Sequence, residues 1–174
     1  PTCEAMARSG FDFLVIDQEH SSIGPAETLG LIQVAQSAGT PVIVRVSGHD
    51  PAEIKKALDA GADGILVPMV NTAEQAARVV AAAYYPPRGN RGAGLFRAQG
   101  WGTEFAAYRE RAAKETTVIV QIEHVDAVRN LDAILAIDGV DGFLVGPYDN
   151  SASLGKPGEF TSPEYKSAME GIAK

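Results

Sequence analysis

The sequence predicts an α/β fold in which short strands alternate with helices, best described as an incomplete TIM (β/α)₈ barrel. Two observations lead to this prediction: five short apolar runs recur along the chain, and polar residues stand where these runs end. Runs that are apolar at consecutive positions suit strands covered on both faces, as in a parallel sheet. The predicted strands are Phe13–Ile16, Val42–Val46, Ile65–Val67, Val118–Ile122 and Phe143–Val145.

Stretches with helix start and stop signals lie between the predicted strands. The helix predicted at Asp50–Leu58 has Asp as its N-cap, Pro at its first helical position and Glu53 three residues after the cap. Thr72 is the corresponding cap of Thr72–Ala83. The other predicted helices are Pro1–Gly10, Pro25–Ser37, His124–Ile134 and Pro163–Lys174. Alternating strands and helices with right-handed crossovers leave two architectures, an open doubly wound sheet or a barrel.

The polar residues at the strand ends favour the barrel. Asp17-Gln18-Glu19-His20, Arg45, Gln121-Ile122-Glu123 and Gly146-Pro147-Tyr148-Asp149 each stand where a predicted strand finishes. In a (β/α)₈ barrel the carboxyl ends of several strands converge on one site. An open sheet would concentrate its ligands at one switch point, usually with a Gly-rich turn after the first strand. No such turn follows Phe13–Ile16.

Length limits how much of a barrel is present. A complete barrel of this type takes about 250 residues, whereas this chain has 174 residues and five predicted strands, and both of its ends fall in predicted helices. We therefore expect residues 1–174 to form a single partial catalytic domain of about five β/α units, without the first and last units. The segment Tyr84–Glu104, rich in Gly, Pro and Arg, is predicted to be a long loop over the site.

Composition and charge exclude several classes of partner. The net charge is −7, from 15 basic and 22 acidic residues, and no Lys/Arg stripe suits a phosphate backbone, so we expect no nucleic acid partner. No apolar run approaches the ~20 residues that cross a bilayer, so we expect no membrane partner. Cys3 is the only cysteine, which excludes an intrachain disulfide and favours a reducing, cytoplasmic setting.

Glu123 and Asp149 are candidate ligands of a divalent metal ion. They lie 26 residues apart, about one β/α unit, at the ends of successive predicted strands. Neighbouring parallel strands are ~4.8 Å apart, so two such carboxylates can reach one ion. A set of carboxylates without Cys or His suits a hard cation such as Mg²⁺ or Mn²⁺, with water and substrate oxygens as further ligands. The alternatives are solvated acids or, for Asp149, a helix N-cap.

His20 is a candidate general base, because imidazole titrates near working pH and this residue ends the first strand unit. The other two histidines, His49 and His124, stand beside predicted helix starts, where polar loop residues are common. Asp59 stands at a predicted helix end, where the helix dipole disfavours an acid. That position indicates a specific partner for Asp59, and an imidazole is one candidate.

Arg45 interrupts an apolar run, and a buried Arg is costly unless it pairs with an anion. A substrate oxygen and Asp17 are both possible partners. The basic segment around Arg88 and Arg91 is either a flexible functional loop or a solvated one.

Taken together, these segments resemble the HpcH/HpaI family of aldolases, which act on 2-keto-3-deoxy acids and on 2,4-dihydroxyhept-2-ene-1,7-dioate. The likeness runs from one end of the chain to the other. It differs at Gln18, where the family usually has Gly, and at Asn150, where it usually has Leu. The matching segments are Gly10–Phe13, Ile16–His20, Val44–Val46, Ile54–Lys55, Leu58–Gly61, Leu66–Val70, Tyr85–Gly89, Arg91–Gly92, Val120–Glu123, Gly139–Gly142 and Gly146–Asp149.

The resemblance implies a role for each candidate residue. Glu123 and Asp149 would bind the divalent cation, Mg²⁺ or Mn²⁺ with Co²⁺ as a further candidate. Gln121 and the backbone at Tyr148 and Asp149 would hold the pyruvate moiety. The implied catalytic residues are His20 as the base, Asp59 raising its basicity, and Arg45 stabilising the enolate.

The implied activity is that of a class II pyruvate aldolase, a carbon–carbon lyase. It would cleave or form a 4-hydroxy-2-keto acid, with pyruvate and an aldehyde as the other partners, in a homo-oligomer such as a hexamer or trimer of dimers. Rival readings are an acyl-CoA lyase of the malyl- or citryl-CoA type, for which only the Arg88–Arg97 segment offers phosphate ligands, and an oxaloacetate decarboxylase. From another class, a truncated, non-catalytic barrel fragment remains open.

Overall fold

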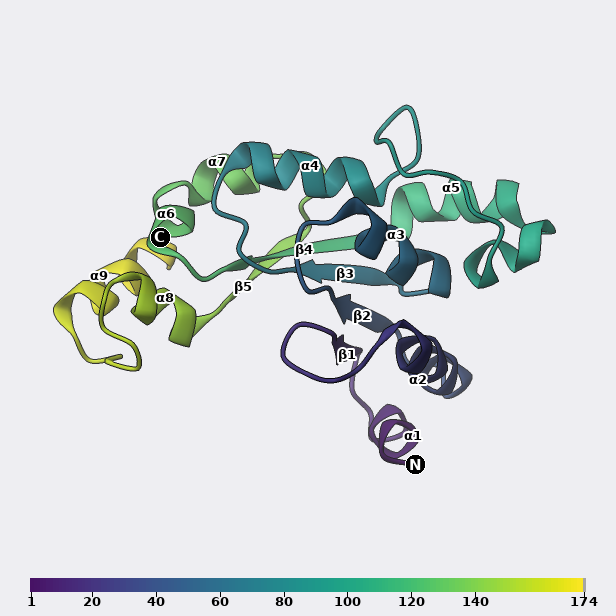
Figure 1. The fold of residues 1–174 in the computed structure, drawn as a ribbon, viewed down its shortest axis with the longest axis horizontal. Helices are drawn as coiled ribbons and strands as arrows, with labels where there is room; N and C mark the ends of the chain where they lie inside the picture. The colour runs from purple at the N-terminus through teal and green to yellow at the C-terminus, as the bar shows by residue number, and fades with distance from the viewer. Residues whose placement is uncertain (174) are drawn as a thin grey trace.

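A computed structural model describes residues 1–173, and its centre is one sheet of five parallel strands (Figure 1). Every neighbouring pair in the sheet is parallel, and the strands are ordered as they occur in the chain. The strands are β1 (Leu14–Asp17), β2 (Val42–Arg45), β3 (Gly64–Val67), β4 (Thr117–Ile122) and β5 (Gly142–Val145). All five predicted strands are confirmed. At most of the strand ends, the observed boundary lies one residue from the predicted one.

Sequential parallel order is the arrangement of a β/α barrel wall, because a doubly wound sheet reverses its strand order at a switch point. Within the described residues the sheet is not closed: β1 and β5 form its two edges. The predicted parallel α/β fold with five strand units is therefore confirmed.

Helices connect the strands, and most of them begin where capping residues predicted. Their bounds are α1 (Thr2–Ala7), α2 (Pro25–Ser37), α3 (Pro51–Ala60), α4 (Ala73–Ala83), α5 (Phe105–Glu115), α6 (Val125–Arg129), α7 (Leu131–Leu135), α8 (Pro147–Ser153) and α9 (Pro163–Ile172), with a 3₁₀ helix η1 (Arg97–Gly102). The single helix predicted at His124–Ile134 is two helices, which meet at Asn130. Lys174, the last residue of the helix predicted at Pro163–Lys174, lies outside the described residues. Across residues 1–173, every helix is too short or too polar to cross a membrane.

Two predicted caps make the hydrogen bonds expected of them. The Asp50 carboxylate accepts from the Ala52 N–H at 2.8 Å. Thr72 Oγ1 accepts from the Gln75 N–H at 3.2 Å, and Gln75 Oε1 accepts from the Thr72 N–H at 3.1 Å. This reciprocal capping box satisfies two of the N–H groups that a helix start leaves without partners.

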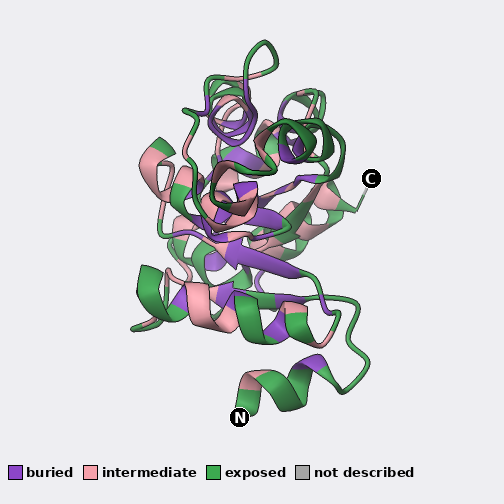
Figure 2. Ribbon diagram, turned by 90° about the vertical axis from the view of Figure 1, so that its right-hand side faces the viewer, coloured by how far each residue is buried: buried purple, intermediate pink, exposed green. Residues whose placement is uncertain are grey.

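The core lies between the sheet and its helices, and it is deepest at the middle strands (Figure 2). All four residues of β3 are buried, whereas none of β5 is. In β1 the side chains of Leu14 and Ile16 are buried, while Val15 between them is 48% exposed. Since successive strand residues point to opposite faces, one face of β1 packs on the helices and the other is left open.

The segment Tyr84–Glu104 lies at the amino ends of the strands, which makes the prediction of a loop over the site wrong for this chain. Tyr84 Oη donates to the Thr116 carbonyl at 2.9 Å, immediately before β4. Arg97 Nη1 donates to the Ala60 carbonyl at 3.0 Å, at the end of α3. Sequence composition identified an irregular segment, but only its side-chain partners decide which edge of the sheet it covers.

Candidate active site

The candidate site lies at the carboxyl ends of the strands, where Arg45 and Asp17 stand opposite each other in the register of β1 and β2. Arg45 Nε donates to Asp17 Oδ1 at 2.9 Å, and Arg45 Nη2 donates to Asp17 Oδ2 at 2.6 Å. This bidentate fork is the stronger form of an ion pair. The guanidinium holds the pKa of Asp17 below its ordinary value. Of the two partners predicted for Arg45, Asp17 is thus confirmed.

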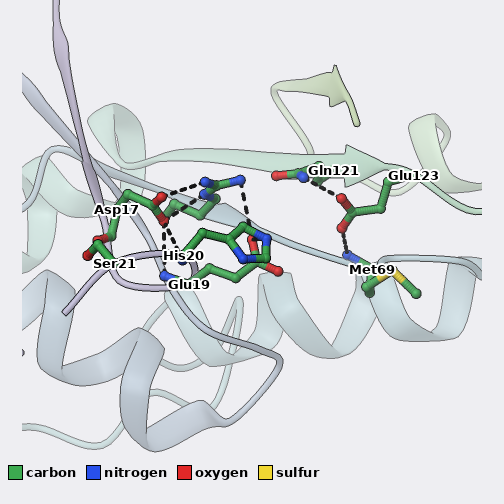
Figure 3. Close-up of polar contacts among 8 residues, drawn as sticks. Asp17, Glu19, His20, Ser21, Met69, Gln121 and Glu123 are labelled. Atoms are coloured by element: carbon green, nitrogen blue, oxygen red, sulfur yellow. Dashed lines mark hydrogen bonds and ion pairs between the residues drawn. The ribbon is translucent and has the colours of Figure 1, made fainter. Parts of the chain in front are cut away.

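Asp17 also fixes the turn that presents the predicted base. Its Oδ1 accepts from the backbone N–H groups of Glu19 at 2.9 Å and of His20 at 3.3 Å. The turn projects the side chains of Glu19 and His20 beyond the end of β1 (Figure 3). The imidazole of His20 is 63% exposed, which suits a group that meets a substrate at the rim of the sheet.

Glu123, just after β4, is a buried carboxylate at this same edge, with 2% of its surface exposed. Its Oε1 accepts from the Met69 N–H at 2.6 Å, and its Oε2 accepts from Gln121 Nε2 (Figure 3). Both of these donors are neutral. A buried charge is costly without a compensating charge, so the position is suited to a cation.

The backbone around Glu123 is shaped to receive its carboxylate. Met69, which donates to it, has a φ of 54°, in the left-handed region that side chains other than glycine rarely adopt. Residues in such conformations cluster at functional sites. On the other side, a Cβ added to Gly146 would lie 2.6 Å from Glu123 Oε2. Only glycine allows the start of α8 to come this close.

Asp149 lies in the first turn of α8, the helix whose start touches Glu123. It is exposed, as is its neighbour Tyr148. The structure therefore places Glu123 and Asp149 on neighbouring β/α units at one edge of the sheet. Asn150, at the second departure from the family pattern, is fully buried with neither Oδ1 nor Nδ2 hydrogen-bonded.

The donor set fits a hard divalent cation. Among residues 1–173, no group of three or more His, Cys, Asp or Glu side chains is placed to hold a metal ion. A metal site here would therefore use at most two carboxylates and take its other ligands from other oxygen groups. Gln121 Oε1, beside Glu123, is buried without a hydrogen-bond partner. An unpaired buried amide oxygen next to a buried carboxylate is a suitable setting for a cation or a polar ligand.

Glu19 is a residue of this site for which the sequence predicts no role. Its Oε2 lies 3.3 Å from Arg45 Nη1 and 3.6 Å from His20 Nε2. Burial and the negative charge of Glu123 raise the pKa of Glu19. The signal was present in Asp17-Gln18-Glu19-His20, but strand alternation does not tell which of these side chains turns toward the site.

Asp59 is not brought to His20 within this chain. It is the next-to-last residue of α3, at the amino end of β3, whereas His20 follows the carboxyl end of β1. Its Oδ1 accepts from Arg91 Nη2 at 2.5 Å and from Gln99 Nε2 at 2.8 Å. The expectation of a specific partner for Asp59 is met by a guanidinium and an amide in place of an imidazole.

Comparison with known proteins finds relatives along the whole chain. A family model described as HpcH/HpaI aldolase/citrate lyase matches residues 2–174. The chain is 44% identical over 173 residues to a hydroxypyruvate/pyruvate aldolase of Sagittula stellata, covering 98% of this chain and 68% of that protein. It is 45% identical over 170 residues to a 2-keto-3-deoxy-L-rhamnonate aldolase of Klebsiella pneumoniae, covering 96% and 63%.

A solved structure extends this likeness to three dimensions. The crystal structure of a HpcH/HpaI aldolase/citrate lyase family protein from Burkholderia cenocepacia superposes with a TM-score of 0.92 at 35% identity, covering 98% of this chain and 69% of that one. The chain thus spans about two thirds of the length of the relatives it matches.

Proposed function

The chain belongs to the HpcH/HpaI aldolase/citrate lyase family, and from this premise we propose that it acts as a metal-dependent class II aldolase. The proposed reaction cleaves a 4-hydroxy-2-keto acid, of the 2-keto-3-deoxy type, into pyruvate and an aldehyde. One observation carries the proposal: the buried Glu123 carboxylate and the unpaired Gln121 amide oxygen share one edge of the sheet with Arg45 and His20.

Glu123 and Asp149 are the proposed holders of a divalent cation, Mg²⁺ or Mn²⁺. When bound, the ion supplies Lewis-acid polarisation of a keto acid. This role is supported by the neutral donors around Glu123, which leave its charge without a cationic partner.

The remaining chemistry falls to the side chains of this chain. Gln121 and the backbone at Tyr148 and Asp149 hold the keto acid. His20 takes the proton of the 4-hydroxyl group, and the bond between C3 and C4 then breaks to release the aldehyde. The electron pair of that bond passes to the pyruvate fragment as its enolate. Arg45 stabilises the negative charge on the keto oxygen, because a fixed guanidinium needs no reorganisation as the charge develops.

The acyl-CoA lyase alternative is less well supported by the basic segment Arg88–Arg97. Arg91 is buried against Asp59, and Arg97 donates to the Ala60 carbonyl. Arg88 lies over the ring of Tyr84 and donates to the Ala113 carbonyl. Each of these arginines is engaged within the fold at the edge opposite the site, so the segment offers no cluster of charges for the phosphates of CoA.

We also propose a homo-oligomer. Leu95 is 62% exposed and Trp101 is 68% exposed, and they stand beside the partly exposed Phe96 on the surface segment that includes η1. Large apolar side chains gathered on a surface are typical of an interface. Light scattering of the purified protein measures the assembly, and a monomer at every concentration would refute it.

The direct test measures pyruvate release from a panel of 2-keto-3-deoxy acids with Mg²⁺ or Mn²⁺ present and after chelation by EDTA. We expect activity only with the metal, and none for Glu123→Ala with any metal. Glu110→Ala, which removes an exposed acid on α5, is the matched control and should behave as the parent. Full turnover in excess EDTA would rule the proposed function out. Oxaloacetate, which lacks a 4-hydroxyl group, separates the decarboxylase alternative, since its decarboxylation should not depend on His20.

A further inference from the structure

We propose that Glu19 is a positioning residue for His20, its carboxylate holding the imidazole with Nε2 as the N–H side and Nδ1 as the free, proton-accepting nitrogen. The catalytic role of Glu19 rests on the proposed function. The contact between Glu19 and the imidazole can be tested whether or not the protein is an aldolase.

The position of one oxygen atom carries the argument. Glu19 Oε2 is buried and has no hydrogen-bond partner. Its two nearest donor groups are Arg45 Nη1 at 3.3 Å and His20 Nε2 at 3.6 Å. An acceptor withdrawn from water without a donor is destabilising. A small movement of the exposed imidazole toward Glu19 would satisfy it, and hydrogen bonds at catalytic sites commonly tighten when ligand binds.

The other carboxylates near the site are engaged elsewhere. Asp17 Oδ1 already accepts from Arg45 Nε and from two backbone N–H groups, and Asp17 Oδ2 accepts from Arg45 Nη2. Glu123 has a donor on each oxygen. Asp149 follows β5, at the far side of the described sheet from β1, which precedes His20. Glu19 is therefore the buried carboxylate beside His20 that has an oxygen left for the imidazole.

The charges around Glu19 make such a partner favourable. Its side chain is only 15% exposed, which withdraws the carboxylate from water. Glu123 repels it, and Arg45, shared with Asp17, attracts it. Because Arg45 is already committed to Asp17 through two of its nitrogens, a second cation beside Glu19 is stabilising. The imidazolium that forms when His20 accepts a proton is such a cation.

The tautomer follows from this contact. A carboxylate has no hydrogen to donate, so the nitrogen that faces it carries the hydrogen, and the hydrogen bond of one ring nitrogen sets the state of the other. With Nε2–H directed to Glu19, the lone pair is on Nδ1. The proton of the 4-hydroxyl group then passes to Nδ1, and the positive charge of the ring is offset by Glu19, without a proton moving to Glu19.

A double-mutant cycle tests whether Glu19 acts through His20. We expect Glu19→Gln to lower kcat for aldol cleavage about 10- to 100-fold, the range found when groups that orient a site residue are removed, with a smaller change in KM. In a His20→Ala background, the same substitution should change the residual kcat less than twofold. Asp12→Asn, which removes an exposed acid before β1, is the charge-matched control and should leave kcat unchanged.

An equal loss from Glu19→Gln in both backgrounds would overturn the inference, because a merely structural role does not depend on the imidazole. Thermal unfolding of each variant shows whether it is folded. If the parent protein releases no pyruvate with any metal, the proposed function fails and the cycle cannot be run. The second measurement then decides the inference about Glu19.

That second measurement is ¹⁵N NMR of the imidazole nitrogens at neutral pH, with His20 assigned from the signal that His20→Ala removes. We expect the parent and Asp12→Asn to show Nε2 protonated and Nδ1 unprotonated, and Glu19→Gln to show a mixture of both tautomers. Identical ring shifts in the parent and Glu19→Gln would contradict the contact, whatever the activity.

Discussion

Two arginine–carboxylate pairs stand at opposite edges of the same sheet, and they differ in what surrounds them. At the carboxyl edge, Arg45 and Asp17 leave 19% and 29% of their side chains exposed. At the amino edge, Arg91 is fully buried and Asp59 is 13% exposed. The pair at the carboxyl edge is thus partly exposed to solvent, and the pair at the amino edge is buried. We call them the open pair and the closed pair.

The closed pair is packed among aromatic and amide side chains, while Arg91 Nε and Nη1 are buried without hydrogen-bond partners. The Arg91 guanidinium lies 4.7 Å from the ring centre of Tyr85 and 5.4 Å from that of Tyr108. Gln99 is buried beside it and donates to Asp59 Oδ1 and to Tyr85 Oη. These residues join α3, the segment before η1, η1 and α5. The cluster therefore holds these four parts of the fold together.

The open pair also has unpaired atoms around it. Beside Arg45 and Asp17, Glu19 Oε2 and Gln121 Oε1 are buried without partners. Because the closed pair has unpaired nitrogens too, neither an arginine–carboxylate pair nor an unpaired polar atom by itself marks a site. The open edge differs in that its unpaired atoms are acceptor oxygens, at an edge where the imidazole of His20 is exposed. That combination suits a ligand such as the proposed keto acid and cation.

The largest expected effect comes from removing the base at the open edge. His20→Ala should lower kcat about 10²- to 10⁴-fold, the usual contribution of general acid–base catalysis, and should leave metal binding intact. Because the imidazole is mostly exposed, the melting temperature should stay close to that of the parent. Steady-state kinetics with calorimetric metal titration measures both. Unchanged turnover would remove His20 from its role and weaken the contrast between the edges.

Arg91→Ala tests the closed edge. Removing one partner of a buried pair leaves a buried charge uncompensated, which costs about 3–5 kcal/mol. Urea unfolding measures the loss, and Arg88→Ala, at a half-exposed arginine of the same segment, should cost less than about 1 kcal/mol. Equal losses of unfolding free energy for the two variants would show that the buried cluster does not hold these parts of the fold together.

Arg45→Lys keeps the positive charge at the open edge and removes the bidentate fork of the guanidinium. We expect kcat to fall about 100-fold, the order seen when one donor to a developing oxyanion is lost. Metal affinity should change little, since Lys remains a point charge at the same place. The free energy of unfolding should fall by only about 1 kcal/mol. A loss of stability as large as that of Arg91→Ala would mean that both edges are structural.

The smallest effect is the pH dependence of the open pair. The pKa of Asp17 is lowered from its ordinary 3.8 by Arg45, so its contribution to stability is complete above 3.8 and is lost as the pH falls through the lowered value. Asp17→Asn should cost about 1 kcal/mol at pH 7. The difference between this variant and the parent should narrow as the pH falls toward 3. A difference that stays constant in urea unfolding at both pH values would show that the Asp17 charge is not what matters.

The fold was largely predictable because its signals are local. The apolar runs became β1 to β5, and the Asp50 and Thr72 caps begin α3 and α4. The prediction missed α5 and α8 and merged α6 with α7. The sequence Phe105–Glu115 has a weak apolar stripe, and α8 begins within a Gly-Pro pair that resembles a turn. In these cases tertiary packing decides between a helix and a loop.

Local patterns along the chain predicted the strand positions, the helix caps and the residues that stand at the strand ends, because periodicity and capping depend only on neighbours in sequence. Packing in three dimensions set the side-chain partners: Arg45 pairs with Asp17, Asp59 pairs with Arg91, and Glu19 faces His20. Those pairings join residues up to 32 positions apart or depend on how a turn projects its side chains. No local sequence pattern encodes these pairings or the direction of the side chains in the turn, because the packing of the strands and helices sets them.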